Sequence, residues 1–124
     1  SYFKAPSGGP LVQHALVAMI EFYHQGKVSL EWIVNKMCHA PADCFHLKDR
    51  GFIREGYFAD LVAVDIDKSW TVAKDNILYD CGWSPFEGTE FKSSVSKTFV
   101  NGNLVYDNGT FDESTRGMRL EFDR

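Results

Sequence analysis

A chain of 124 residues that is 44% hydrophobic and 15% aromatic has the length of about one domain and is too apolar for a disordered segment. Its 13 basic and 17 acidic residues give a net charge of −4, so charge provides no reason to expect a nucleic-acid partner. We find no signal peptide and no apolar stretch of membrane length, and we expect a cytoplasmic protein without a membrane partner. Cys38, Cys44 and Cys81 are odd in number and lack CxxC spacing, which favours reduced thiols.

The first half of the chain is predicted to be helical. Residues 11–25 carry apolar side chains in two adjacent helical rows, and Gly26 can end this helix. Ser29 is a typical N-cap for a second helix, and Pro41 favours a short third helix that ends near Phe45. Because the apolar surface is wide, we expect the first helix to be buried more than a surface helix. Its rows are Val12, Leu16, Met19, Ile20 and Tyr23, and Leu11, Ala15, Ala18 and Phe22.

The second half is predicted to be β-structure, with the two halves meeting near residues 47–52. ADLVAVDID at 59–67 is typical of a strand that ends in acidic turn residues. SKTFVNGNLVYDNGTF at 96–111 predicts a hairpin with a type I′ turn at Asn101-Gly102, and Asn108-Gly109 marks a further turn. The segment from Trp70 to Phe91 is less regular, and we interpret SPFEGTEF at 84–91 as an ordered loop that places Pro85 and Phe86 on a sheet.

A metal site is conceivable at Cys38, His39, Asp43 and Cys44, since thiolates and imidazoles are zinc ligands. However, Pro41 interrupts the helical register that would bring His39 and Asp43 together. A helix boundary with two buried, unreactive thiols explains the same residues, and we favour this structural interpretation.

The remaining titratable residues do not form a catalytic constellation by themselves. His14 and His24 lie ten residues apart on one predicted helix and cannot converge, so we place each at the surface or facing a partner. His46 lies in a connector. No Ser-His-Asp order, Walker loop or dinucleotide fingerprint is present. Three acidic residues are assigned to strand ends: Asp60, Asp65 and Asp67.

The loop APSGGP at 5–10 has two interpretations. As a helix entry, it would use Ser7 as a capping residue and Pro10 near the first helical position. As a ligand contact, it would use the Gly-Gly pair to bring backbone N–H groups close to an anion. Local pattern alone leaves both open.

Three segments taken in order resemble the C-terminal end of cyclic amidohydrolases: APSGGPLVQHALVAM, HAPADCFHLKDRGFIREGYFADLVAVDID and SPFEGTEFKSSVSKTFVNGNLVY. They are similar to the family's loop and helix after the last metal-binding aspartate, its Gly-x-Ile-x-x-Gly turn with an Ala-Asp-Leu-Val strand, and its closing Ser-Pro-Phe-x-Gly segment with a Val-x-Gly hairpin. Dihydroorotases are the most similar subfamily, and allantoinases and hydantoinases share much of this ending.

The resemblance implies an α/β fold. Residues 1–50 would be the last loop and helices of a (β/α)₈ TIM barrel, and residues 51–124 would be part of an accessory β-sandwich. In this family the sandwich also uses strands from the N-terminus. The barrel holds two zinc ions through a His-x-His pair, a carboxylated lysine, two further histidines and an aspartate. These ligands would precede Ser1, so the resemblance implies neither a catalytic nor a metal-binding residue in this segment.

The same resemblance implies a substrate and partners. The parent enzyme would convert N-carbamoyl-L-aspartate to L-dihydroorotate and back. The loop backbone would help to hold the substrate carboxylate, with Pro6 to Gly8 in contact and Gly9 needed for the turn. The expected substrate-binding residues are Ala5, Pro6, Ser7, Gly8 and Gly9. The segment alone is expected to be inactive, and to be ordered as an oligomer or beside the rest of its parent chain. Alternatives are an allantoinase or hydantoinase, or an inactive homologue with a scaffold role.

Overall fold

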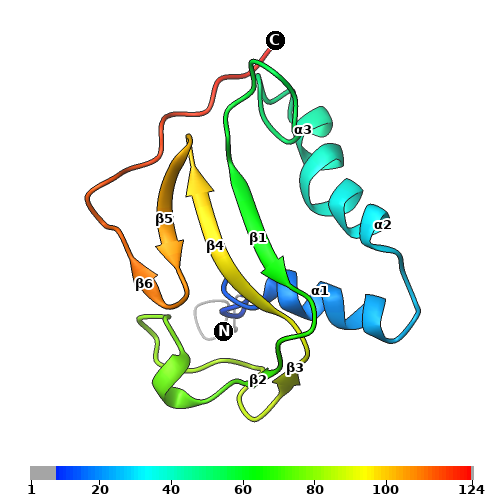
Figure 1. The fold of residues 1–124 in the computed structure, drawn as a ribbon, viewed down its shortest axis with the longest axis vertical. Coiled ribbons are helices and arrows are strands. Elements are labelled where there is room, and N and C mark those ends of the chain that lie inside the picture. Colours follow the sequence, from blue (N-terminus) through cyan, green and yellow to red (C-terminus); the bar gives the residue numbers. More distant parts are fainter. Residues whose placement is uncertain (1–7, 124) are drawn as a thin grey trace, which may run out of the picture.

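The structure is a computed structural model that describes residues 8–123, with helices in the first part of the chain and strands in the second (Figure 1). Helix α1 (Ala15–His24) is followed by α2 (Leu30–Val34), a π-helical turn η2 (Asn35–His39) and α3 (Ala40–Cys44). The last three elements are continuous and form one long helix.

Helix α1 ends as predicted, but it begins four residues later than residue 11. Gly26 has a φ of +68°, and the Lys27 N–H donates to the Phe22 carbonyl, which is the bond expected of a left-handed helix end. At the other end, residues 12–14 form a turn in which the His14 N–H donates to the Leu11 carbonyl at 3.1 Å.

The predicted apolar rows of α1 are only partly buried. Val17 and Ile20 are buried, but Val12 is 91% exposed and Phe22 is also exposed. Val17 packs in a cluster with Val72 and Phe91, so α1 turns a different face toward residues 70–91 than the apolar pattern indicated. Apolar periodicity reports how much of a helix can be buried, and the partner determines which face it is.

Pro41 does not begin a separate helix, which corrects the prediction for residues 41–45. The Ala40 N–H donates to the carbonyl of Asn35, five residues back, so the helix widens in the turn before the proline. A proline ring clashes with the carbonyl four residues earlier, and a π-helical turn relieves that clash without ending the helix. The N-cap prediction is confirmed, since the Ser29 hydroxyl accepts from the Trp32 N–H at 3.2 Å.

Four strands form an antiparallel sheet in the order β1-β4-β5-β6. Their bounds are β1 (Leu61–Asp65), β4 (Ser94–Val100), β5 (Asn103–Asp107) and β6 (Thr110–Phe111). Both predicted hairpin turns are confirmed, because φ is positive at both residues of Asn101-Gly102 and of Asn108-Gly109. Lys97 and Asp107 face each other across β4 and β5 with Nζ and Oδ2 2.7 Å apart, and this hydrogen bond, followed by one from Asn108, lowers the pKa of Asp107.

Residues 70–91 contain a separate two-stranded sheet of β2 (Trp70–Thr71) and β3 (Glu90–Phe91), with a 3-10 helix, η3 (Lys74–Asn76), between them in the chain. Figure 1 shows these elements next to α1 and beyond one end of the larger sheet. Phe86 packs against the Val17–Val72–Phe91 cluster, with its ring 5.4 Å from that of Phe91. Phe86 of the loop predicted at 84–91 thus packs on the small sheet, and the last two residues of that loop form β3.

The junction between helices and strands is tightly packed. Arg50 is 7% exposed, pairs with the Asp60 carboxylate and donates to Asn101 Oδ1 at 2.8 Å. The other Asp60 oxygen accepts from the Asn101 N–H at 2.8 Å, so the pair joins the start of β1 to the β4–β5 turn. Gly51 follows with a φ of +80° and no room for a side chain beside Ala42. The end of the chain returns here, since the Lys48 N–H donates to the Glu121 carbonyl.

Candidate functional site

The predicted substrate loop is described only at its last two residues. Ala5, Pro6 and Ser7 lie outside the described residues. Gly8 has a φ of +71°, whereas Gly9 is not in the left-handed region, so the conformation that requires glycine is at Gly8 rather than at Gly9 as expected. Both are exposed, and a Cβ atom added at either would meet open space within the described part of the chain.

The loop is not the N-terminal cap of α1. The N-cap residue is His14, whose side chain makes no capping hydrogen bond with any residue from 8 to 123. The helix-entry interpretation required Ser7 as the cap and Pro10 near the first helical position, and both expectations are wrong for α1. Residues 10–14 therefore separate the glycine loop from the helix, and capping does not explain the loop sequence.

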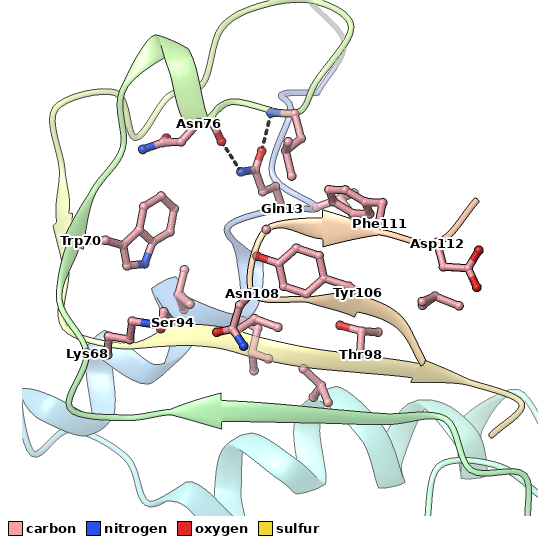
Figure 2. Close-up of a pocket in the computed structure, with 18 of the residues that line it drawn as sticks. Gln13, Lys68, Trp70, Asn76, Ser94, Thr98, Tyr106, Asn108, Phe111 and Asp112 are labelled. Atoms are coloured by element: carbon pink, nitrogen blue, oxygen red, sulfur yellow. Dashed lines mark hydrogen bonds between the residues drawn. The ribbon is translucent and has the colours of Figure 1, made fainter. Parts of the chain in front are cut away.

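Gln13 connects this stretch to the residues around η3. Its Nε2 donates to the Asn76 carbonyl at 2.8 Å, and its Oε1 accepts from the Leu78 N–H at 2.9 Å, as Figure 2 shows. Its backbone N–H also donates to the Tyr79 hydroxyl at 2.8 Å. One residue thus makes three hydrogen bonds to a segment more than 60 positions away in the chain.

His14 is buried, so its predicted place at the surface is wrong. The residue is 0% exposed, and its Nδ1 lies 3.1 Å from the Ser84 Oγ and 3.5 Å from the Tyr79 hydroxyl. Its ring stacks on Trp70 with centroids 5.8 Å apart and planes inclined by 28°. Phe86 and Phe91 complete the surroundings. This environment is the reason that a polar residue on α1 occupies a buried position.

Burial also determines the charge state of His14. Loss of solvation lowers its pKa below the usual 6.5, because an imidazolium loses more hydration energy on burial than a neutral imidazole. Its Nε2 atom has no hydrogen-bond partner among residues 8–123. His14 is therefore held as a neutral side chain that packs and orients, and its buried position does not suit a residue that exchanges protons with solvent.

A large groove lies between the start of α1, residues 68–78 and one face of the four-stranded sheet (Figure 2). Its volume is about 930 Å³. Trp70, Tyr106 and Phe111 contribute aromatic surface, and Val12 and Leu16 of the predicted apolar rows also line it. An apolar groove of this size on a sheet face is typical of a surface that packs against further polypeptide.

The other candidate residues do not assemble into a site. Cys38, Cys44 and Cys81 are free and exposed, so the expectation of buried thiols is wrong. The His39 ring stacks on Phe52 at 4.4 Å, which leaves it with a packing role. Within residues 8–123, no group of three or more His, Cys, Asp and Glu side chains could hold a metal ion. The resemblance implies zinc ligands outside this segment, and Cys38, His39, Asp43 and Cys44 do not form a metal site among the described residues.

The two remaining histidines and the acidic residues have structural roles or none. His24 Nε2 lies 3.1 Å from the Ser93 Oγ, which attaches the end of α1 to the residues after β3. His46 is exposed in the connector. Asp65 accepts from the Asp67 N–H at 3.1 Å in a turn that ends β1, as predicted, and Asp60 pairs with Arg50.

Sequence reasoning missed the residues that hold the stretch after the loop in place, Gln13, Tyr79 and Ser84, and it missed Arg50 at the junction of helices and strands. One of these residues, Ser84, could have been singled out from the sequence, because it begins the Ser-Pro-Phe-x-Gly segment that carries the family resemblance. Its hydroxyl accepts from the Phe86 N–H at 3.2 Å while it contacts His14. A contact between positions 14 and 84 depends on tertiary structure and cannot be found from local spacing.

Comparison with known proteins identifies the family. The family model described as "Amidohydrolase family" matches residues 9–105. The chain belongs to this family. Among curated amidohydrolase relatives, the dihydroorotase of Pyrococcus horikoshii is 31% identical over 114 residues, which are 92% of this chain and 27% of that protein. The dihydroorotase of Halobacterium salinarum is 38% identical over 108 residues, 87% of this chain and 25% of that protein. The chain thus spans about a quarter of these amidohydrolases, and the resemblance seen in its sequence is confirmed.

Solved amidohydrolase structures share the fold. An L-hydantoinase (dihydropyrimidinase) from Arthrobacter aurescens superposes with a TM-score of 0.78 at 29% identity, covering 90% of this chain and 25% of that one. A D-hydantoinase (dihydropyrimidinase) from Thermus sp. has a TM-score of 0.82 at 22% identity over 90% of this chain and 25% of its own, and this likeness concerns the fold alone. In the described part of the amidohydrolase chain, none of the helices has the length and apolarity needed to span a bilayer.

Proposed function

We propose that this chain is the C-terminal part of a dihydroorotase, which closes N-carbamoyl-L-aspartate to L-dihydroorotate and reopens it. The observation that carries the proposal is the similarity to dihydroorotases over about nine-tenths of the chain. In this proposal residues 1–50 belong to the barrel and residues 51–124 to the β-sandwich. The metal ligands and the proton-transferring aspartate would be supplied by the rest of the protein.

The contribution proposed for this chain is contact with the substrate carboxylate through the glycine loop, residues 5–9. Two features support it. Gly8 has a left-handed backbone conformation, and such a residue allows successive backbone N–H groups to turn toward an anion. Moreover, His14 occupies the N-cap position of α1, so the competing explanation of the loop as the cap of this helix no longer applies.

The groove and the exposed side of α1 support an association with the rest of the parent chain. Val12 is nearly fully exposed although it belongs to a predicted buried row, and it lines the groove. We propose that barrel strands cover the exposed face of α1 and that N-terminal sandwich strands cover the groove. Burying side chains of this size stabilises a protein by about 1.5–3 kcal/mol each, so the isolated segment lacks a large part of its stabilising contacts.

A hydantoinase is the second candidate, because the solved structures above are hydantoinases at up to 29% identity. The substrates of the two enzymes differ, because dihydroorotate carries a carboxylate on its ring and hydantoin does not. The deciding experiment assays the full-length protein with L-dihydroorotate and with hydantoin, each with and without a chelator. A dihydroorotase turns over only the first, and turnover of hydantoin alone would replace our proposal by the second candidate.

Turnover of neither substrate would favour the inactive scaffold homologue. The same assay on the 124-residue chain with added zinc is expected to show no activity. Chelator-sensitive turnover by this chain would contradict the placement of the catalytic groups outside it.

A further inference from the structure

Residues 74–84 hold the stretch that directly follows the glycine loop. The Gln13 carboxamide bonds to both the Asn76 carbonyl and the Leu78 N–H, in the manner of a strand partner (Figure 2). Asn76 is itself held, since its Oδ1 accepts from the Ala73 N–H and its Nδ2 donates to the Thr71 carbonyl. The contact is therefore between the residue two positions before α1 and a turn that has its own internal hydrogen bonds.

The next residue strengthens the connection. The His14 Nδ1 lies 3.1 Å from the Ser84 Oγ, and the ring is enclosed by aromatic side chains. The Tyr79 hydroxyl accepts from the Gln13 N–H and lies 3.5 Å from His14, so it joins the two contacts. We name the hydrogen bonds of Gln13 and His14 to residues 76–84 the α1 clamp.

The clamp lies very close to the loop. Only residues 10–12 separate Gly9 from Gln13, and Pro10 has a fixed φ. Among residues 8–123, Gln13 is the first residue after the loop with a hydrogen bond to a distant part of the chain. The exposed Gly8 and Gly9 make no such bond within this range. The position of their backbone therefore depends on where the clamp holds the following residues.

We propose that the α1 clamp positions Gly8 and Gly9 of the glycine loop, and that Gln13 and Tyr79 are positioning residues for binding of the substrate carboxylate. This inference rests on the proposed function of the loop. Residues 74–84 then act on substrate affinity without touching substrate. Because a loop that is displaced by a fraction of an ångström contacts the bound anion less well, loss of the clamp weakens binding more than it slows the chemical step.

The test uses the full-length protein with Gln13→Met, which keeps the side-chain length and removes both carboxamide bonds. Gln25→Met is the matched control, because Gln25 is an exposed glutamine at the other end of α1. Amide hydrogen exchange is measured for peptides covering residues 8–14 and 74–79, because the N–H groups of residues 13 and 14 donate to the Tyr79 hydroxyl and the Leu11 carbonyl. We expect faster exchange of both peptides in Gln13→Met and wild-type exchange in the control. Unchanged exchange at 8–14 would overturn the proposal.

Kinetics with L-dihydroorotate provide the functional measurement. Gln13→Met is expected to raise KM about tenfold with kcat within about twofold of the wild type, as expected for the loss of one or two hydrogen bonds that support binding. Gln13→Glu keeps the acceptor for the Leu78 N–H but places a carboxylate oxygen against the Asn76 carbonyl, so it should not restore the affinity that the carboxamide provides. A wild-type KM, or a fall in kcat alone, contradicts the inference.

Failure of the proposed function is distinguishable from failure of the clamp. If the wild-type protein does not turn over dihydroorotate, the proposed function is wrong, and the exchange measurement still decides whether the clamp holds the loop. If Gln13→Met does not fold, Tyr79→Phe is used, because it removes only the hydroxyl that accepts from the Gln13 N–H. It should accelerate exchange at 8–14, and unchanged exchange there again contradicts the proposal.

Discussion

A side chain at Gly51 should destabilise the protein strongly, and the structure separates two reasons. A Cβ atom there would lie 2.3 Å from the Ala42 Cβ and 2.9 Å from the Cys38 carbonyl oxygen, far inside van der Waals contact. The residue also has a φ of +80°, which L side chains rarely adopt. For Gly51→Ala the left-handed backbone costs about 1–2 kcal/mol and overpacking about 1–3 kcal/mol, so we expect a loss of about 2–5 kcal/mol.

Gly56→Ala isolates the backbone contribution. Gly56 has nearly the same φ, +84°, but a Cβ there meets open space among the described residues. The assay is urea unfolding of the full-length protein followed by tryptophan fluorescence, and the expected cost of Gly56→Ala is about 1–2 kcal/mol. The double variant Gly51→Ala/Ala42→Gly should lose less stability than the sum of its single variants, because it removes the 2.3 Å contact. Equal costs for Gly51→Ala and Gly56→Ala would refute the packing argument.

Three further predictions concern His14, the glycine loop and the isolated chain. Burial lowers the pKa of His14 in the folded state, so the unfolded chain binds more protons than the folded one just below pH 6.5. The contribution of His14 to the free energy of unfolding should therefore be full above pH 6.5 and fall as the pH is lowered. In urea titrations, His14→Phe should flatten this pH dependence, and the control His46→Asn, at an exposed residue, should keep it. Gly8→Val in the full-length protein should raise KM for dihydroorotate well above the effect of Gly9→Val, since only Gly8 has a left-handed φ; equal KM values would return the loop to a structural role. In sedimentation, the isolated 124-residue chain should associate or aggregate at micromolar concentration, and a well-folded monomer would contradict the proposed covering of α1 and the groove.

The preferences of neighbouring residues determine several turns, a helix cap and a strand of this protein independently of its tertiary structure. The turn at Asn101-Gly102 was predictable because those two residues tolerate positive φ better than other pairs do, and the Ser29 cap because a hydroxyl satisfies a free N–H at a helix start. The strand at 61–65 and the end of α1 at Gly26 were predictable for similar reasons. The family could be recognised because three such segments occur in a fixed order.

Tertiary structure decided which face of α1 is buried and which polar side chains are buried with it. The burial of His14 required Trp70, Ser84 and Phe91 from elements more than 50 residues away, and no spacing within the helix encodes their approach. The continuity of the helix through Pro41 was likewise not local, since the proline sequence is compatible with either a break or a widened turn. The sequence by itself determined the turns at 101–102 and 108–109 and the order of a helical part and a strand part, because those preferences are properties of neighbouring residues. Which residues contact Gln13, just after the glycine loop, was decided by the fold, because hydrogen bonds between positions 13 and 78 form only when packing brings them together.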